Sequence, residues 1–186
     1  MTTARRIQVC TVRQGDPLAA PLLAELAVEY STRYERPLDE QIHTLTTHPA
    51  DEFAEPDGTL LMLVEDGEPV AGGAFRRYDA TTAELKRIWT SKAHRRRGLG
   101  RLVLEELEAE AARRGYARIY LTTGWRQPEA VALYLAAGYT ALFDPGRPAE
   151  EIGPHPFEKT LIRLRTDRPR RLSPDGSAGI GRPQPS

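Results

Sequence analysis

The chain of 186 residues has the length of one domain, and its 26 lysine and arginine residues balance its 26 aspartate and glutamate residues. This neutral balance gives no reason to expect a nucleic-acid partner or a membrane partner, and no apolar run approaches the roughly 18 residues of a membrane span. Cys10 is the only cysteine, so an intrachain disulfide is excluded and a cytoplasmic location is expected. The four histidines lack paired ligand spacing, so no metal is expected.

The first third of the chain predicts one strand and two helices. Apolar and polar residues alternate over 6–13, a pattern typical of a strand. Asp16 suits a helix N-cap and Pro17 the first helical position, although Pro21 leaves the geometry of the first turn open. The elements expected here are a strand over 6–13, a helix over 17–34, a short helix over 37–46 and a loop over 48–58.

Three strands are predicted next, and they lead directly into a glycine-containing turn and a helix. Asp66–Gly67 is a hairpin signal, and the pair Gly72–Gly73 indicates a bulge or a close approach of neighbouring groups. The expected elements are strands over 59–65, 69–78 and 83–91, a helix over 99–114, a strand over 116–123, a helix over 128–138, and strands over 139–143 and 156–164. This order predicts a mixed α/β domain.

The composition of the chain changes after Arg165. The segment over 166–186 is rich in proline, glycine and serine and has almost no large apolar residues. Such a composition cannot build a packed core, so we expect this segment to be disordered. The predicted organisation is one folded domain over 1–165 followed by a disordered tail over 166–186.

The turn HRRRGLGR, residues 94–101, is the strongest candidate for a binding site. At the start of the following helix the backbone N–H groups lack intrahelical partners, the helix dipole favours an anion, and glycine lets the anion approach closely. Arginines are unfavourable beside this dipole unless an anion neutralises them. The P-loop pattern is excluded because no Gly-Lys-Ser/Thr is present, and the dinucleotide pattern because Val103 replaces its third glycine. A solvated basic turn or a small nucleic-acid patch is the alternative.

Two motifs lie in the order and context of a known family. Residues 95–100, RRRGLG, match the signature Arg/Gln-x-x-Gly-x-Gly/Ala, and residues 127–139, QPEAVALYLAAGY, are similar to a later helix that runs to Leu-Tyr and ends in Gly-Tyr or Gly-Phe. With them the chain resembles the GNAT superfamily of acyl-CoA-dependent N-acyltransferases over roughly residues 5–165. The resemblance implies an α/β fold with a mixed, mostly antiparallel sheet of about seven strands flanked by helices, whose splayed middle strands form the acyl-CoA cleft.

The resemblance also implies where acyl-CoA would bind. The pantetheine arm would lie along the strand ELKRIWT, and the thioester oxygen would receive a backbone N–H near Ile88 or Trp89. Gln127 stands where many relatives carry an asparagine that contacts the pantetheine, which leaves its role open. The pyrophosphate would sit on the amides of the turn, and its side-chain partners would be Arg95, Arg96 and Arg101. The residues implied in binding are therefore Ile88, Trp89, Thr90, Arg95, Arg96, Arg97, Gly98, Leu99, Gly100, Arg101 and Gln127.

Two catalytic residues, Tyr134 and Glu84, are implied by the same resemblance. Tyr134 matches the tyrosine whose hydroxyl approaches the CoA sulfur, where it can protonate the departing thiolate; the alternative is an ordinary core aromatic. Glu84 stands where many relatives place a glutamate that takes the proton of the amine, directly or through water, and partial burial can raise the pKa of such a group. The alternative for Glu84 is an exposed strand-end residue, and His94 is interpreted as a surface residue. Other candidates for the base are Glu35, Asp39 and Glu40.

The function implied is transfer of an acetyl group from acetyl-CoA to a primary amine of a small molecule. No cysteine or serine nucleophile stands in a motif, so direct attack in a ternary complex is expected, in a cytoplasmic monomer or homodimer. Three alternatives stay open: a protein lysine or N-terminal acetyltransferase, an acyl-CoA-binding module without turnover, and a nucleic-acid-binding protein using arginines over 95–97 and 168–171. The acceptor cleft is expected to be built by the first helices and the loop over 144–155, and the sequence does not name the acceptor.

Overall fold

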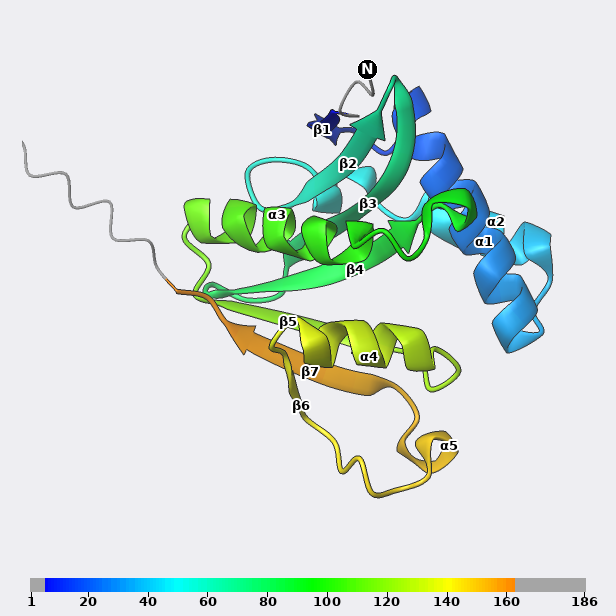
Figure 1. The fold of residues 1–186 in the computed structure, drawn as a ribbon, viewed down its shortest axis with the longest axis vertical. Coiled ribbons are helices and arrows are strands. Elements are labelled where there is room, and N and C mark those ends of the chain that lie inside the picture. The colour runs from blue at the N-terminus through cyan, green and yellow to red at the C-terminus, as the bar shows by residue number, and fades with distance from the viewer. Residues whose placement is uncertain (1–5, 163–186) are drawn as a thin grey trace, which may run out of the picture.

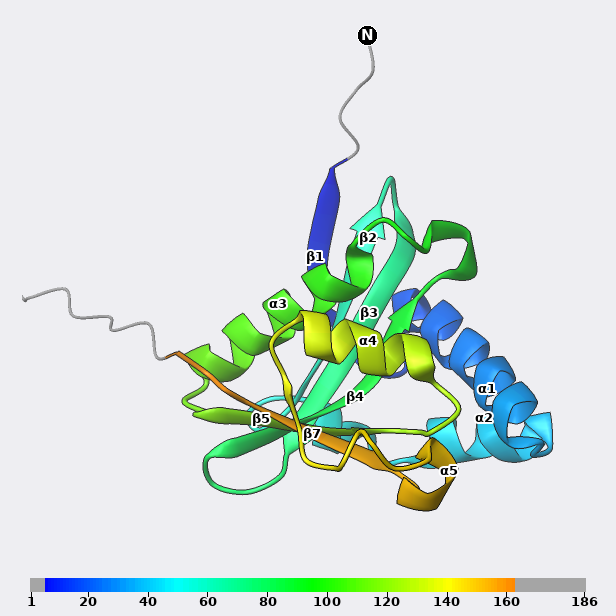
Figure 2. The same cartoon turned by 60° about the horizontal axis from the view of Figure 1, so that its bottom comes forward.

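Seven strands form one sheet in the order β1-β2-β3-β4-β5-β7-β6, and helices cover both of its faces (Figures 1 and 2). The computed structural model describes residues 6–162. The strands are β1 (Ile7–Val12), β2 (Thr59–Glu65), β3 (Glu68–Arg77), β4 (Thr82–Thr90), β5 (Arg118–Thr123), β6 (Thr140–Ala141) and β7 (His155–Thr160). The α-helices are α1 (Ala20–Tyr34), α2 (Leu38–Thr47), α3 (Leu99–Arg113), α4 (Pro128–Ala136) and α5 (Ala149–Ile152). This architecture confirms the predicted α/β fold and its seven-stranded, mostly antiparallel sheet.

The middle of the sheet opens between β4 and β5. These strands pair in parallel, and their pairing runs only from Thr82 opposite Arg118 to Glu84 opposite Tyr120. Beyond Glu84 the two strands diverge (Figure 1). The stretch of β4 over 85–90 therefore has β3 as its sheet partner on one edge, and on the edge that faces β5 it has no ladder partner among residues 6–162.

Two apolar layers hold the helices against the sheet. The strand β2 alternates its side chains between the layers, as the period of an extended strand requires: Leu61 and Leu63 pack under α3, whereas Leu60 and Met62 pack under α1. Both layers are buried, which explains why β2 is almost entirely apolar. The pattern that predicted a buried strand here thus reflects helices on both faces.

The glycine pair Gly72–Gly73 in β3 allows close packing of neighbouring side chains and lies at a bulge in the pairing with β4. A Cβ on Gly72 would lie 2.5 Å from the sulfur of Met62, and one on Gly73 would lie 2.8 Å from Cδ1 of Ile88. The register between β3 and β4 shifts at this point, and Arg87 in the opposing strand takes a positive φ of 59°. Glycine is required here because a side chain at Gly72 would displace the core beneath α1 and one at Gly73 the core beneath α3.

The predicted N-terminal helix begins differently from the expectation. Asp16 caps it as predicted, accepting a hydrogen bond from the Leu18 N–H (2.8 Å), but the first turn is the 3-10 helix η1 (Pro17–Ala19). Pro21 has no N–H to donate to the Pro17 carbonyl, so Ala20 donates instead, and α1 starts one turn late.

Other differences lie in the connecting segments. The expected loop over 48–58 contains the 3-10 helix η2 (Ala50–Phe53), and the expected strand over 139–143 pairs only as β6, before a turn in which Gly146 donates to Asp144 (2.8 Å). The strand predicted to end at 164 ends at Thr160, and the tail over 166–186 lies outside the described residues. None of the helices in the described part has the length and apolar character that a membrane crossing needs.

Candidate active site

A cavity of about 740 Å³ lies where β4 and β5 separate. Side chains of α1, α2, β4, β5 and α4 form its walls. Three residues that the sequence singled out line it, namely Ile88, Gln127 and Tyr134. Two of the predicted binding residues and the predicted acid thus lie at the opening in the sheet.

The turn before α3 presents free backbone donors. Gly98 precedes the helix with φ of 75°, and the first intrahelical bond runs from the Leu102 N–H to the Gly98 carbonyl (3.1 Å). Within the described residues the N–H groups of Leu99, Gly100 and Arg101 have no hydrogen-bond partner. They stand at the positive end of the helix dipole, which is the arrangement that binds an anion.

Gly100 places this helix start at the mouth of the opening. A Cβ on Gly100 would lie 3.3 Å from Cδ2 of Leu133 in α4 and 3.6 Å from Oγ1 of Thr90 in β4. The residue therefore sits between the two elements that flank the separated strands. A larger residue would occupy the space through which a ligand reaches the free amides.

The four arginines of the turn are not equivalent. Arg97 donates two hydrogen bonds to the buried carboxylate of Glu65 (2.6 and 3.0 Å), which ties the turn to the end of β2. Arg95 pairs with Glu29 (3.3 Å) and Arg101 with Glu105 (2.9 Å), and both side chains are largely exposed. The hydrogen bonds that Arg97 donates to Glu65 raise the pKa of Arg97. Arg97 thus has a structural partner, whereas the other arginines can turn toward a ligand.

His94 is more enclosed than the sequence suggested. It ends the 3-10 helix η3 (Lys92–His94) just before the arginines and is half-buried. Its Nδ1 is buried and has no hydrogen-bond partner among the described residues. An unpartnered polar atom beside free backbone amides fits a site that receives a polar ligand.

The three β4 residues predicted to line the cleft point in different directions. Ile88 lines the cavity and packs on the side of α3. Trp89 is buried on the opposite face, where its Nε1 donates to Glu25 of α1 (3.0 Å). Only the backbone of Trp89 is therefore available at the opening.

Gln127 is held at the start of α4. Its Oε1 accepts hydrogen bonds from Oγ1 of Thr123 (2.8 Å) and from the Gly124 N–H (3.3 Å). These contacts fasten the end of β5 to the helix that follows it. The side chain lines the cavity from this anchored position.

Tyr134 is buried with its ring packed against Tyr139 and Phe157, at centroid distances of 5.7 and 5.6 Å. Its hydroxyl has no hydrogen-bond partner among the described residues, and the side chain lines the cavity. Burial raises the pKa of Tyr134, with a smaller effect from Tyr30. The hydroxyl is therefore a neutral proton donor at neutral pH.

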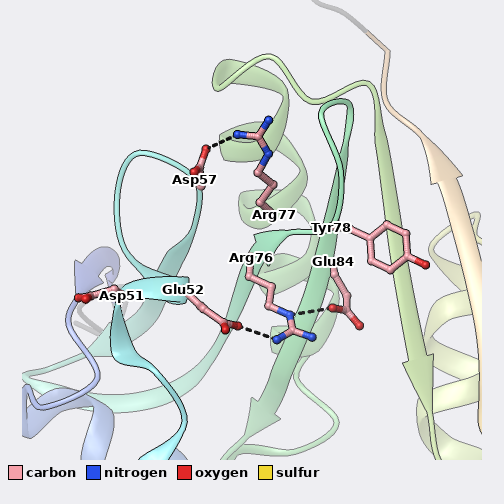
Figure 3. A pocket seen from close by; sticks show the side chains of 7 residues that line it. All are labelled: Asp51, Glu52, Asp57, Arg76, Arg77, Tyr78 and Glu84. Atoms are coloured by element: carbon pink, nitrogen blue, oxygen red, sulfur yellow. Dashed lines mark hydrogen bonds and ion pairs between the residues drawn. The ribbon is translucent and has the colours of Figure 1, made fainter.

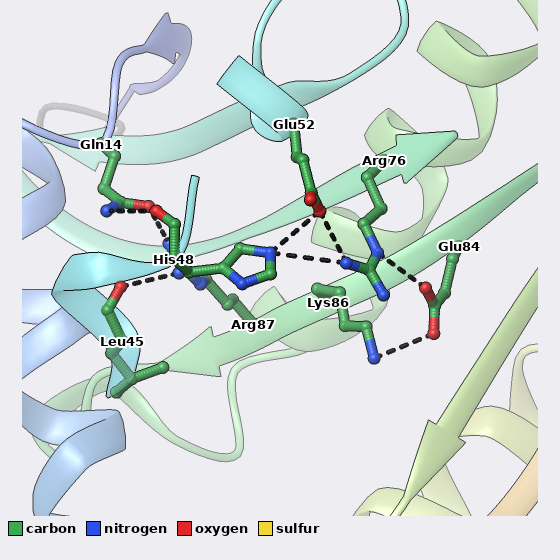
Figure 4. Close-up of polar contacts among 8 residues, drawn as sticks. All are labelled: Gln14, Leu45, His48, Glu52, Arg76, Glu84, Lys86 and Arg87. Carbon is green, nitrogen blue, oxygen red and sulfur yellow. Dashed lines mark hydrogen bonds and ion pairs between the residues drawn. The ribbon is translucent and has the colours of Figure 1, made fainter. Parts of the chain in front are cut away.

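Glu84 is buried rather than exposed. Its carboxylate pairs with Nε of Arg76 (2.8 Å) and Nζ of Lys86 (2.9 Å) (Figures 3 and 4). Burial alone would raise the pKa of Glu84, but the hydrogen bonds from Lys86 and Arg76 outweigh it and lower the pKa. Glu84 lines a second cavity of about 600 Å³, and Arg76 lines both cavities, so the carboxylate lies beside their common wall.

The other carboxylates considered as bases lie elsewhere. Glu35, Asp39 and Glu40 are exposed, and none of them lines either cavity. The cavity wall formed by α1 and α2 instead contributes Tyr30, Tyr34 and Leu45. These carboxylates therefore have no geometry that favours catalysis.

Sequence reasoning missed two polar residues of the cavity, His48 and Arg87. His48 Nε2 lies 3.0 Å from Glu52, which also accepts from Arg76 (2.6 Å) (Figure 4). Arg87 is buried in β4 and lines the cavity. The signal that was available is the arginine itself, a charge inside the otherwise apolar end of a strand.

The seven-stranded fold and the opening between β4 and β5 are those expected of the acetyltransferase class, and comparison with known proteins supports this assignment. The model of the acetyltransferase (GNAT) family matches residues 21–139, so the chain belongs to this family. It is 34% identical over 85 residues to the uncharacterized N-acetyltransferase YsnE of Bacillus subtilis, a match that covers 46% of this chain and 54% of that protein. The chain thus spans about half the length of this curated relative.

Solved structures share the fold over most of the chain. A protein of Klebsiella pneumoniae assigned as an acyl-CoA N-acyltransferase is 26% identical, with a TM-score of 0.65 over 84% of this chain and 98% of that one. The PaiA N-acetyltransferase of Thermoplasma acidophilum, solved in complex with coenzyme A, is 15% identical, with a TM-score of 0.66 over 83% of this chain and 99% of that one.

Proposed function

We propose that this protein transfers the acetyl group of acetyl-CoA to the primary amine of a small molecule, by direct attack in a ternary complex in the cytoplasm. The observation that carries the proposal is the opening between β4 and β5, because a free strand edge, a cavity and free helix amides meet there. The coenzyme A bound to the Thermoplasma acidophilum relative supports the choice of acyl donor.

The donor fits the groups available at this opening. The free amides of Leu99, Gly100 and Arg101, with the exposed arginines of the turn, suit the pyrophosphate. The edge of β4 over 85–90 offers backbone groups to the pantetheine arm. A backbone N–H near Ile88 would then stabilise the oxygen of the thioester as negative charge develops on it.

The chemistry requires the amine nitrogen to attack the thioester carbonyl carbon as the carbon–sulfur bond breaks. The proton that the nitrogen loses passes to Glu84, directly or through water, and the departing thiolate takes the proton of the Tyr134 hydroxyl. Cys10 lies on β1 and lines neither cavity, which favours direct transfer over an acetyl-cysteine intermediate.

A thiol-release assay tests the proposal. Acetyl-CoA is incubated with the protein and a panel of amino acids, polyamines, aminoglycosides and aromatic amines, and acetylated products are identified by mass spectrometry. We expect release with at least one small amine and none in its absence. Release only with lysine or N-terminal peptides would identify a protein acetyltransferase, and calorimetric binding of acetyl-CoA without any release would identify a binding module.

A further inference from the structure

A buried guanidinium faces the cavity from the bulge in β4. Arg87 is 8% exposed, lines the cavity and takes a positive φ of 59° at the bulge. Its side chain donates to Oε1 of Gln14 (2.7 Å) and to the Leu45 carbonyl (2.8 Å) (Figure 4). The guanidinium also stacks on Phe53, 4.5 Å from the ring centroid. All of these partners are neutral.

The other charges of this region compensate one another. Arg76 bridges Glu52 and Glu84, and Lys86 also pairs with Glu84. The cavity lining itself contains four lysine or arginine residues and no aspartate or glutamate. Of these four, Arg36 pairs with Glu40 (3.8 Å), and the other three, Arg76, Lys86 and Arg87, face the two carboxylates Glu52 and Glu84, which leaves one positive charge.

Arg87 carries that charge, because no carboxylate among the described residues pairs with it. Isolated buried charges are costly to a fold and are normally paired. Burial lowers the pKa of Arg87 to about 10, which still leaves the guanidinium charged at neutral pH. An anion entering the cavity would supply the missing partner.

We propose, resting on the function proposed above, that the acetyl acceptor is an amine that also carries a carboxylate, an amino-acid-like molecule whose carboxylate binds Arg87. A guanidinium matches a carboxylate through parallel hydrogen bonds. Polyamines and aminoglycosides, which are polycations, would instead be repelled by the uncompensated charge of Arg87.

The position of Arg87 suits a short acceptor. Arg87 and Ile88 line the same cavity, and the thioester oxygen is expected near Ile88, so one molecule in this cavity can bind its carboxylate to Arg87 and present its amine to the acetyl group. Tyr30, Tyr34 and Phe53 in the same lining give an apolar wall for the body of the molecule. An α-amino acid with an aromatic or apolar side chain combines these features.

Paired acceptors test the inference. The twenty common L-amino acids and their amides, with spermidine, are compared by thiol release for the wild type, Arg87→Gln, Arg87→Lys and the control Arg113→Gln. Arg113 is an exposed residue at the end of α3, outside both cavities. We expect at least one acid to exceed its amide in kcat/KM by about 10- to 100-fold, the range for a hydrogen bond between charged groups.

The variants separate recognition from folding. Arg87→Gln should remove the preference for the acid over its amide, because KM for the acid should rise with little effect on the amide. Arg87→Lys should keep part of this preference. Arg113→Gln should keep all of it. Circular dichroism checks each fold, and the wild-type comparison of acid with amide decides the matter if Arg87→Gln does not fold. Equal use of amides, a preference for spermidine, or equal losses on acids and amides in a folded Arg87→Gln would overturn the inference.

A binding measurement distinguishes this inference from the proposed function. Calorimetry in the presence of CoA compares N-acetyl-L-phenylalanine with N-acetyl-L-phenylalaninamide on wild type and Arg87→Gln. Tighter binding of the acid by the wild type alone supports the carboxylate site even if no amine releases thiol, in which case only the proposed function fails. Equal binding of the two compounds, or no binding of either, overturns the carboxylate site.

Discussion

Two side chains near the opening favour opposite protonation states at neutral pH. Burial keeps the Tyr134 hydroxyl protonated, whereas Arg76 and Lys86 keep the buried Glu84 ionised. One group therefore carries a proton and the other carries none, as the proposed acid and base require, but both shifts move the pKa values away from neutral pH and so make Tyr134 a weaker acid and Glu84 a weaker base. Each role depends on the immediate neighbours of the side chain rather than on its residue type.

Tyr134→Phe should lower turnover by roughly 10²- to 10⁴-fold, the usual range for loss of a general acid. The ring contacts to Tyr139 and Phe157 remain, and the hydroxyl has no partner among the described residues, so stability should change little. Acetyl-CoA affinity should also change little, because the proton moves in the transition state. Steady-state kinetics with calorimetry measure both effects.

Tyr116→Phe is the matched control for this substitution. Its hydroxyl donates to the Asp57 carbonyl (2.7 Å), and the residue lines neither cavity. Loss of this hydroxyl should lower the free energy of unfolding by about 0.5–1.5 kcal/mol and leave turnover unchanged. Wild-type turnover in Tyr134→Phe would assign Tyr134 to the core alone.

Glu84→Gln should reduce turnover, by roughly 10²- to 10⁴-fold if the carboxylate is the base. The pKa of Glu84 is lowered from 4.5, so the base is present throughout the neutral range and is lost only as the pH falls below about 4.5. Any acidic limb of the pH–rate profile between pH 6 and 9 should therefore persist in the variant, because another group, such as the amine itself, causes it. Disappearance of that limb in Glu84→Gln would contradict the lowered pKa.

At the scale of elements, the start of α3 lacks the side-chain groups that normally stabilise the first turn of a helix. Its first turn contains no acidic residue, and its N-cap, Gly98, makes no side-chain cap hydrogen bond. A helix normally satisfies these amides with a capping side chain. Their availability, with Gly100 packed between β4 and α4, gives this end of the helix its capacity to bind an anion.

Gly100→Asp should weaken acetyl-CoA binding by about 10- to 100-fold or more, because a carboxylate would occupy the free amides and repel the pyrophosphate. The fold should survive, since an acidic residue in the first turn of a helix is favourable. Calorimetry with acetyl-CoA measures the loss, and Gly15→Asp, at a glycine with nothing within 4 Å of its Cβ position, is the matched control. Unchanged affinity in a folded Gly100→Asp would remove the pyrophosphate site from this turn.

At the scale of the whole molecule, the two parts of the sheet share the core beneath α3 and are also joined by a short ladder and a bridge. The ladder is the short parallel pairing of β4 with β5, and the bridge joins the end of α1 to the segment before α4. There Arg33 donates to the Arg126 carbonyl (2.5 Å) and Arg126 to the Arg33 carbonyl (2.6 Å). The cavity lining includes Tyr34 at the end of α1, Trp125 before α4, and residues of β4 and β5, so the width of the cavity depends on both connections.

Truncation after Arg165 should leave the melting temperature and kcat close to those of the full chain. The removed segment is rich in proline, glycine and serine and has almost no large apolar residues to contribute to a core. Thermal melts and the thiol-release assay on both proteins measure the two quantities. A large loss of either would show that this segment contacts the domain or its cavity.

The sequence by itself determined the features that depend on neighbouring residues. Alternation, caps and turn residues predicted the strands, the main helices and the mixed α/β order, because the signals for these elements lie within a few residues of one another. The turn over 94–101 and the helix containing Tyr134 were found for the same reason, since each motif is contiguous. The first turn before Ala20 shows the limit of such signals, because two prolines altered a helix start that Asp16 otherwise marked.

The tertiary structure decided how the site is charged. Arg97 meets Glu65 across 32 residues of sequence and Arg87 meets Gln14 across 73, so no local pattern announces either contact. The same holds for the burial of Glu84, which follows from helices and loops folded over β4. Long-range packing selects the partner of each charged group, and that partner determines whether the group supports the fold, holds a proton or remains free for a ligand.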